Sequence, residues 1–125
     1  SVGVKQRSPS GKEIEELPHL PDSCPNEYVA ARMVYPADLL AKNISGYALC
    51  EFTIDKEGVI LRPHILKSTH PEFAEEALRI VKEMPKWTPA LVGGKPADST
   101  YTLYVPFRPR LYKEQVRERG LSKKD

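Results

Sequence analysis

The stretch GYALCEFTIDKEGVILRPHILKS, residues 46–68, decides the fold of this chain. Apolar side chains occupy every second position of its first part. They are Ala48, Cys50, Phe52 and Ile54. Because successive side chains of a strand point to opposite faces, this spacing predicts a strand that lays one face on a core.

A turn and a second strand follow within the same stretch. Asp55 and Gly58 bracket the sequence DKEG, in which Asp can bond its own backbone and Gly can adopt a positive φ. Residues 59–67 then return as a second strand and complete a β-hairpin. An isolated hairpin is only marginally stable in water, so a third strand and a covering element are needed.

Two prolines predict the order of the strands. Pro63 lies in the second strand, and Pro106 lies in a third strand predicted over residues 100–108. Proline cannot donate a hydrogen bond to a ladder and is therefore confined to sheet edges. We expect an antiparallel sheet in the order second–first–third. Its inner face should carry these apolar residues: Phe52, Ile54, Ile60, Ile65, Leu103, Val105 and Phe107.

Residues 71–83 give the clearest helix prediction. Pro71 suits the first helical position, and Glu72 suits the N-terminal end of the helix dipole. Apolar residues recur at helical spacing and form one stripe. They are Phe73, Ala77, Ile80, Val81 and Met84. A shorter helix is predicted over residues 36–43, whereas residues 27–34 fit either a helix or a strand.

These elements predict an α+β fold, in which a three-stranded antiparallel sheet of order 2-1-3 packs against one long helix, with a short N-terminal helix. The domain spans residues 27–108, and Trp87, the only tryptophan, is expected in its core. Residues 1–26 hold four prolines and form a linker or extended segment. Residues 109–125 form a basic tail, for which a short surface helix and disorder both remain open. In the linker, three residues are candidates for contact with the domain: Leu17, Leu20 and Pro21.

Charge and composition exclude several classes of function. Residues 35–108 carry nine basic and nine acidic groups, so the predicted domain lacks the basic surface that nucleic acid needs. The three histidines, His19, His64 and His70, have no metal-ligand spacing. No serine or cysteine is paired with a base in a motif, so we expect neither an enzyme nor a bound cofactor. Cys24 and Cys50 are expected as free thiols, with a disulfide between them as the alternative.

A family resemblance rests on several motifs in combination. They are a Tyr-Pro pair at 35–36, the hairpin GYALCEFTIDKEGVI, the segment HPEFAEEALRIVKEMPKWTPA, the turn GGKP and the strand YTLYVPFR. Over residues 35–108 the chain resembles the C-terminal domain of TonB energy transducers, in the form common in Bacteroidetes. Three features depart from the usual pattern: Pro63, Tyr104 and Pro106 stand where the family usually has other residues.

The resemblance implies a periplasmic domain that binds the TonB box of outer-membrane receptors, which joins as an extra strand on the third strand. The implied partner-binding residues are Tyr35, Pro36, Thr100, Tyr101, Thr102, Leu103, Tyr104 and Val105. It also implies an inner-membrane anchor and contact with inner-membrane proton-channel proteins through an N-terminal part. The chain starts at Ser1 without Met, and we interpret it as a piece of a longer protein.

Two further possibilities remain open at the level of sequence. An extracytoplasmic regulatory or scaffold domain of a membrane sensor is the alternative function. One transmembrane helix and a Pro-rich spacer in the full-length protein would favour the transducer, whereas several helices with a metalloprotease motif would favour the sensor. A free third-strand edge also makes a homodimer plausible, because unpaired strand edges can pair with each other.

Overall fold

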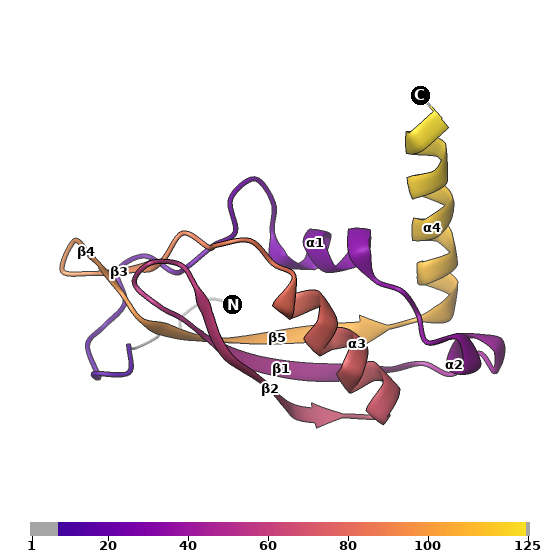
Figure 1. Ribbon diagram of the computed structural model, residues 1–125, viewed down its shortest axis with the longest axis horizontal. Helices are drawn as coiled ribbons and strands as arrows, with labels where there is room; N and C mark the ends of the chain where they lie inside the picture. The colour runs from indigo at the N-terminus through magenta and orange to yellow at the C-terminus, as the bar shows by residue number, and fades with distance from the viewer. Residues whose placement is uncertain (1–7, 125) are drawn as a thin grey trace.

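A computed structural model describes residues 8–124 of the chain (Figure 1). The helices are α1 (Pro25–Arg32), α2 (Ala37–Ala41), α3 (Pro71–Lys82) and α4 (Pro109–Lys124). The strands are β1 (Gly46–Ile54), β2 (Ile60–Ser68), β3 (Ala90–Val92), β4 (Lys95–Ala97) and β5 (Ser99–Phe107). The fold is therefore α+β, as the sequence predicts.

Strand β1 lies at the centre of the main sheet, whose order is β2-β1-β5, and both of its pairings are antiparallel. The predicted order is confirmed, and both proline-containing strands lie at edges. The pairing of β1 with β5 runs without interruption from Gly46–Phe107 to Ile54–Ser99. The pairing with β2 is irregular at two places, and Arg62, just before Pro63, has a φ of 52°.

The turn between β1 and β2 forms as predicted. The Asp55 carboxylate accepts hydrogen bonds from the backbone N–H groups of Glu57 and Val59, each at 2.9 Å. Gly58 has a φ of 88°, and a Cβ at this position would lie 2.0 Å from the Trp87 carbonyl oxygen. Glycine is thus required here by both conformation and space. The Trp87 N–H donates to the Gly58 carbonyl at 2.9 Å, which fastens the turn to the core.

Helix α3 covers the inner face of the sheet with its predicted stripe. Phe73, Ala77, Ile80 and Val81 are fully buried, whereas Met84 packs at the margin of the core. On the strands, Phe52, Ile54, Leu103, Val105 and Phe107 are buried, and Ile60 and Ile65 of the edge strand are partly buried against them. The Phe73 and Phe107 rings stack with their centroids 4.1 Å apart. The predicted inner face is confirmed.

Trp87 lies in the core, as expected, and is 3% exposed. Its ring contacts Phe52 and Tyr101, with centroids 5.7 Å and 4.8 Å away. The segment after it forms the small hairpin β3-β4, which is paired through residues 90–97. The N-terminal segment reaches the same region, because Glu16 forms an isolated antiparallel β-bridge with Leu91, and His19 forms one with Thr88.

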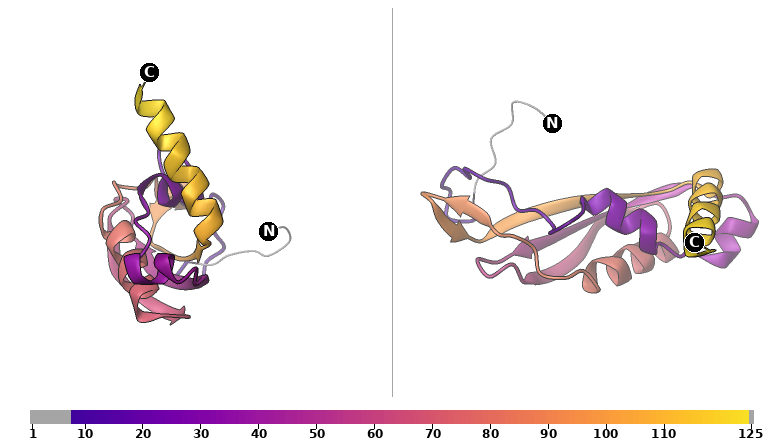
Figure 2. Two further views of the ribbon diagram at one scale, coloured as in Figure 1. Left: turned by 90° about the vertical axis from the view of Figure 1, so that its right-hand side faces the viewer. Right: turned by 90° about the horizontal axis from the view of Figure 1, so that it is seen from above.

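The segments that the sequence left open are largely helical. Of residues 27–34, those up to Arg32 lie in α1, and the basic tail forms α4, which projects from the sheet end where β5 stops (Figure 1 and Figure 2). Within the N-terminal segment, Leu20 is buried as expected, whereas Leu17 is 54% exposed and Pro21 is also exposed. No helix among the described residues is long and apolar enough to span a membrane.

Both cysteines are free thiols in the structure, so the alternative disulfide does not form. Cys24 is exposed and Cys50 is buried in the inner face of β1. Burial raises the pKa of the Cys50 thiol to about 11, against a smaller lowering by a hydrogen bond from the His64 backbone. The Cys50 thiol is therefore neutral at physiological pH.

The core position of Phe52 gives a stability prediction. Its ring is 1% exposed, so Phe52→Ala should lower the free energy of unfolding by about 3–5 kcal/mol through lost burial and a residual cavity. Urea denaturation measures this value. Leu66→Ala is the control, because Leu66 is 51% exposed and its loss should change stability by no more than about 0.5 kcal/mol. A loss below about 1 kcal/mol for Phe52→Ala would show that the inner face is assigned wrongly.

The two cysteines should differ in reactivity. Since the thiolate is the nucleophile, iodoacetamide near neutral pH should modify Cys24 and leave Cys50 unmodified in the folded protein. Mass spectrometry of proteolytic fragments identifies the modified site. In denaturant both cysteines should react. Equal modification of the two in the folded state would contradict the buried position of Cys50.

Candidate functional site

The candidate site is the open edge of β5. In the sheet order β2-β1-β5, β5 has one neighbour and leaves its other side unpaired. An unpaired strand edge presents N–H and C=O groups that can bind another strand. Natural proteins usually block or cover such an edge, so the groups that remain accessible on β5 decide what it can bind.

The hydrogen bonds of Tyr47 show which β5 groups face outward. The Tyr47 N–H donates to Thr69 Oγ1 at 3.0 Å, and the Thr69 N–H donates to the Tyr47 carbonyl at 3.0 Å. Tyr47 therefore points its backbone groups to the β2 side. Since alternate residues of a strand bond to opposite neighbours, Gly46 and Ala48 bond to β5. Their partners are Phe107 and Val105.

The same alternation continues along the regular β1-β5 pairing. The backbone groups of the odd-numbered residues of β5 form hydrogen bonds with β1, and those of the even-numbered residues face the open edge. Three outward N–H donors result, from Thr100, Thr102 and Tyr104. Pro106 occupies the next outward position but has no N–H, so the row of donors ends at Tyr104.

The structure divides the sequence-predicted binding residues on β5 into two groups. The side chains of Thr100, Thr102 and Tyr104 are exposed. Tyr101, Leu103 and Val105 turn inward, where Leu103 and Val105 are buried. Burial raises the pKa of the Tyr101 hydroxyl, which keeps it neutral. The inward residues hold the strand in place, and the outward ones line its accessible side.

Tyr35 and Pro36 lie apart from the open row of donors. The Tyr35 ring is 3% exposed and meets Phe73 and Phe107 edge to face, each with centroids 5.7 Å apart. Its hydroxyl donates to the Ile44 carbonyl, and burial raises its pKa. Pro36 is half-buried at the start of α2. The pair thus fixes the chain beside the end of β5, and its accessible part is the Pro36 ring.

Helix α1 lies beside β5, on the side away from β1 (Figure 1). Two arginines fasten its C-terminal end. Arg79 of α3 donates to the Arg32 carbonyl at 2.9 Å, and Arg119 of α4 donates to the Ala31 carbonyl at 2.8 Å. Cations are favourable at this end of a helix, because its unpaired carbonyls carry partial negative charge.

Arg79 is itself held by two carboxylates of its own helix. Glu76 accepts bonds from Arg79 at 2.7 Å, and Glu83 accepts a further one at 3.2 Å. The hydrogen bonds to Glu76 raise the pKa of the Arg79 guanidinium, and burial opposes this. Glu76 also accepts the Val34 N–H at 2.7 Å. The cluster joins α3 to the segment just after α1.

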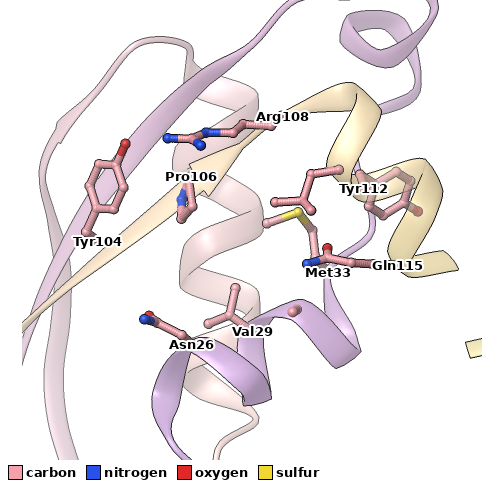
Figure 3. A pocket seen from close by; sticks show the side chains of 10 residues that line it. Asn26, Val29, Met33, Tyr104, Pro106, Arg108, Tyr112 and Gln115 are labelled. Carbon is pink, nitrogen blue, oxygen red and sulfur yellow. The ribbon is translucent and has the colours of Figure 1, made fainter. Parts of the chain in front are cut away.

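A pocket of about 320 Å³ opens between α1, the second half of β5 and α4 (Figure 3). Its walls are largely apolar. The apolar lining residues are Val29, Ala30, Met33, Pro106, Leu111 and Tyr112. Tyr104 lines it from the exposed side of β5, and the remaining polar lining groups are Asn26, Arg108 and Gln115. This pocket could not be predicted from the sequence, because the segments that form α1 and α4, which build two of its walls, have no clear helical pattern.

One sequence signal for α1 was available. Pro25 occupies the first turn of the helix, where its missing N–H costs nothing, and the Glu27 carboxylate accepts the Cys24 N–H at 3.4 Å. Helix α4 likewise begins at Pro109. No group of three or more His, Cys, Asp or Glu side chains that could hold a metal ion is found in the described part of the chain.

An α+β domain in which a helix backs a three-stranded antiparallel sheet, with β2 and β5 as its outer strands, defines the class of this protein. Residues 31–109 match the family model described as Gram-negative bacterial TonB protein C-terminal. The chain belongs to this family, which confirms the resemblance. Domains of the family are periplasmic, associated with transport and non-catalytic. No curated protein matches the chain at a significant level.

The contacts of Arg119 give a prediction on how α4 is held. Arg119→Ala removes the bonds to the Ala31 and Met33 carbonyls, so the α4 amides should exchange with deuterium several-fold faster than in the wild type. Arg117→Ala, on the exposed side of the same helix, is the matched control. Unchanged exchange in Arg119→Ala would mean that its two hydrogen bonds do not hold α4 against α1.

Proposed function

We propose that this domain is the receptor-binding part of a TonB-type energy transducer. It binds the TonB box of outer-membrane receptors by strand addition to β5. The observation that carries the proposal is the row of outward N–H donors on Thr100, Thr102 and Tyr104. The other side of β5 is paired with β1, which holds this strand in place. In strand addition, main-chain hydrogen bonds supply affinity and side-chain pockets supply specificity.

The proposed role has two ends. At the outer membrane, the receptor segment is extended and joins the sheet. At the inner membrane, an anchor in the full-length protein connects the domain with proton-channel proteins, whose energy drives uptake through the receptor. The proposal is supported by the family membership and by the periplasmic setting that the family implies.

The open edge also suits a second copy of this chain, because two such edges can pair with each other. Pro106 limits this pairing, since it removes a donor from the row. A homodimer through β5 would compete directly with the receptor segment. Sedimentation of the peptide-free domain over a range of concentrations therefore precedes the binding experiment.

The binding experiment uses a synthetic TonB-box peptide from a receptor of the same organism. Titration should shift the amide signals of Thr100, Thr102 and Tyr104 most, because these N–H groups acquire new acceptors. The affinity should be micromolar or weaker, since a free peptide loses conformational entropy when it binds. Thr102→Pro should abolish binding and leave the β1-β5 bonds in place, because the Thr102 N–H faces away from β1.

Thr102→Ala is the matched control, because it changes the side chain and keeps the backbone donor. It should bind within a few-fold of the wild type. If several such peptides leave the β5 amides unmoved, and shifts occur on α4 or at Trp87 instead, the transducer proposal fails. The sensor-domain alternative would then be preferred.

A further inference from the structure

We propose that the pocket between α1, β5 and α4 selects the partner. It binds an apolar side chain at the end of the added segment, and Arg108 at its mouth binds a carboxylate next to that side chain. This inference rests on the proposed strand addition and names the chemistry of the segment that the edge accepts. The pocket would thus act as the specificity site of the β5 edge.

The first argument is the position of the pocket along the edge. Tyr104 is the last outward donor of β5 and also lines the pocket. Pro106, the next outward position, forms part of the wall. A segment that pairs along β5 loses a hydrogen bond at Pro106, because proline has no N–H, so the ladder is weakened there. Tyr104 and Pro106 both line the pocket (Figure 3), so the residue that follows the last paired position of the segment would lie next to it.

The second argument is the chemistry of the walls. Val29 and Met33 are 4% and 5% exposed and form an apolar floor. Tyr104 and Leu111, at 48% and 42%, are among the most exposed large apolar side chains of the described residues. An apolar group in the pocket would cover both of them. A volume of about 320 Å³ lies at the low end of ligand sites, about 300–1,000 Å³, and suits one or two side chains.

The third argument is the charge at the mouth. Arg108 is an exposed cation and the lining residues of the pocket include no Asp or Glu. The adjacent helix α4 adds Arg110 and Lys113 near its start. Glu114 on this helix is paired with Arg110 at 4.0 Å. The pocket mouth therefore favours a carboxylate, which Arg can bind through two parallel hydrogen bonds.

The fourth argument is the origin of the walls. The family match covers residues 31–109, so most of α1 and nearly all of α4 lie outside it. Arg119 joins the two helices through the Ala31 and Met33 carbonyls and so fixes the separation of the walls. The strand edge lies within the matched range. So do four lining residues of the pocket, which are Met33, Tyr104, Pro106 and Arg108, whereas the other lining residues come from the parts of α1 and α4 outside it. A pocket that is partly built outside the matched range can distinguish among partners that share the same strand pairing.

The test uses a panel of synthetic extended peptides measured by fluorescence anisotropy. One set of peptides has the variable residues at its N-terminus and another set has them at its C-terminus. In each set the terminal residue is Leu or Ala, and its neighbour is Asp, Asn or Lys. Wild-type domain should bind the Leu-Asp peptides at least tenfold more tightly than the Ala-Asn peptides. Ala30→Trp, which fills the pocket, should remove the preference for Leu. Arg108→Glu should reverse the preference from Asp to Lys.

Two controls separate the pocket from the edge. Arg117→Trp places the same ring on the exposed side of α4, at a residue that does not line this pocket, and should keep the wild-type preferences. Thr102→Pro removes strand addition and should abolish binding of every peptide. If Ala30→Trp and Arg108→Glu keep the wild-type preferences while Thr102→Pro blocks binding, the pocket inference is overturned and strand addition stands. If the Thr102→Pro variant binds the peptides as tightly as the wild-type domain does, both proposals fail.

A second measurement covers the case in which Ala30→Trp does not fold. In the wild-type domain labelled at the methionine methyl groups, the Met33 methyl signal should shift when a Leu-Asp peptide binds. The Met84 methyl group, which lines a different pocket with Val81 and Pro85, should not shift. Bound peptide that leaves the Met33 signal in place would overturn the inference without any mutation.

Discussion

The structure depends on one constraint: β1 pairs with a strand on each side, whereas β2 and β5 each pair on one side only. The inward residues of β1 are fully buried, so a slip of one position would turn Phe52 and Ile54 toward solvent. The regular pairing with β5 therefore has a single allowed register. That register decides which β5 groups are satisfied by β1 and which remain available. The composition of the open edge is thus set by the core.

The positions of α1 and α4 follow from polar contacts in addition to the packing of Tyr28, Val29 and Tyr112 against the core. Tyr28 donates to the Glu83 carbonyl at 2.9 Å, and Arg79 and Arg119 donate to carbonyls at the end of α1. The Arg32 guanidinium lies 3.7 Å from the centre of the Tyr28 ring, a cation–π contact. Such contacts are directional, so they fix how α1 sits beside β5. The edge is flanked by α1 without being paired to it.

The sheet and α3 could be predicted because their residues repeat with a clear period. The alternation in β1 and the stripe on α3 each indicate one buried face. Pro63 and Pro106 indicate the two edge strands. The helices α1 and α4 could not be assigned in this way. In α1 the buried residues Tyr28 and Val29 are adjacent, and α4 is held largely by Arg119 and Tyr112, so neither shows a long apolar stripe.

The site residues predicted on the third strand lie on β5, an edge strand of the sheet, but the sequence could not give their geometry. Sequence alone could not show that Tyr35 is a core residue, since a tyrosine is compatible with either a buried or an exposed position. Nor could it separate the outward N–H groups of β5 from the inward ones, because that choice depends on the bonds of Tyr47 to Thr69 on the other side of the sheet. The pocket needed α1 to lie beside β5 and α4, which are far from it in sequence.

The interruption of the donor row at Pro106 limits how long any added segment stays bound. Each new main-chain hydrogen bond contributes about 0.5–1.5 kcal/mol net, whereas ordering each residue costs about 1–2 kcal/mol. Three outward donors therefore cannot hold an extended segment for long by themselves, and differences in affinity at such an interface are expressed mainly as dissociation rates. A short row of this kind favours brief, repeated contacts over a permanent complex. The residence time of the bound segment is then set by side chains at the end of the donor row.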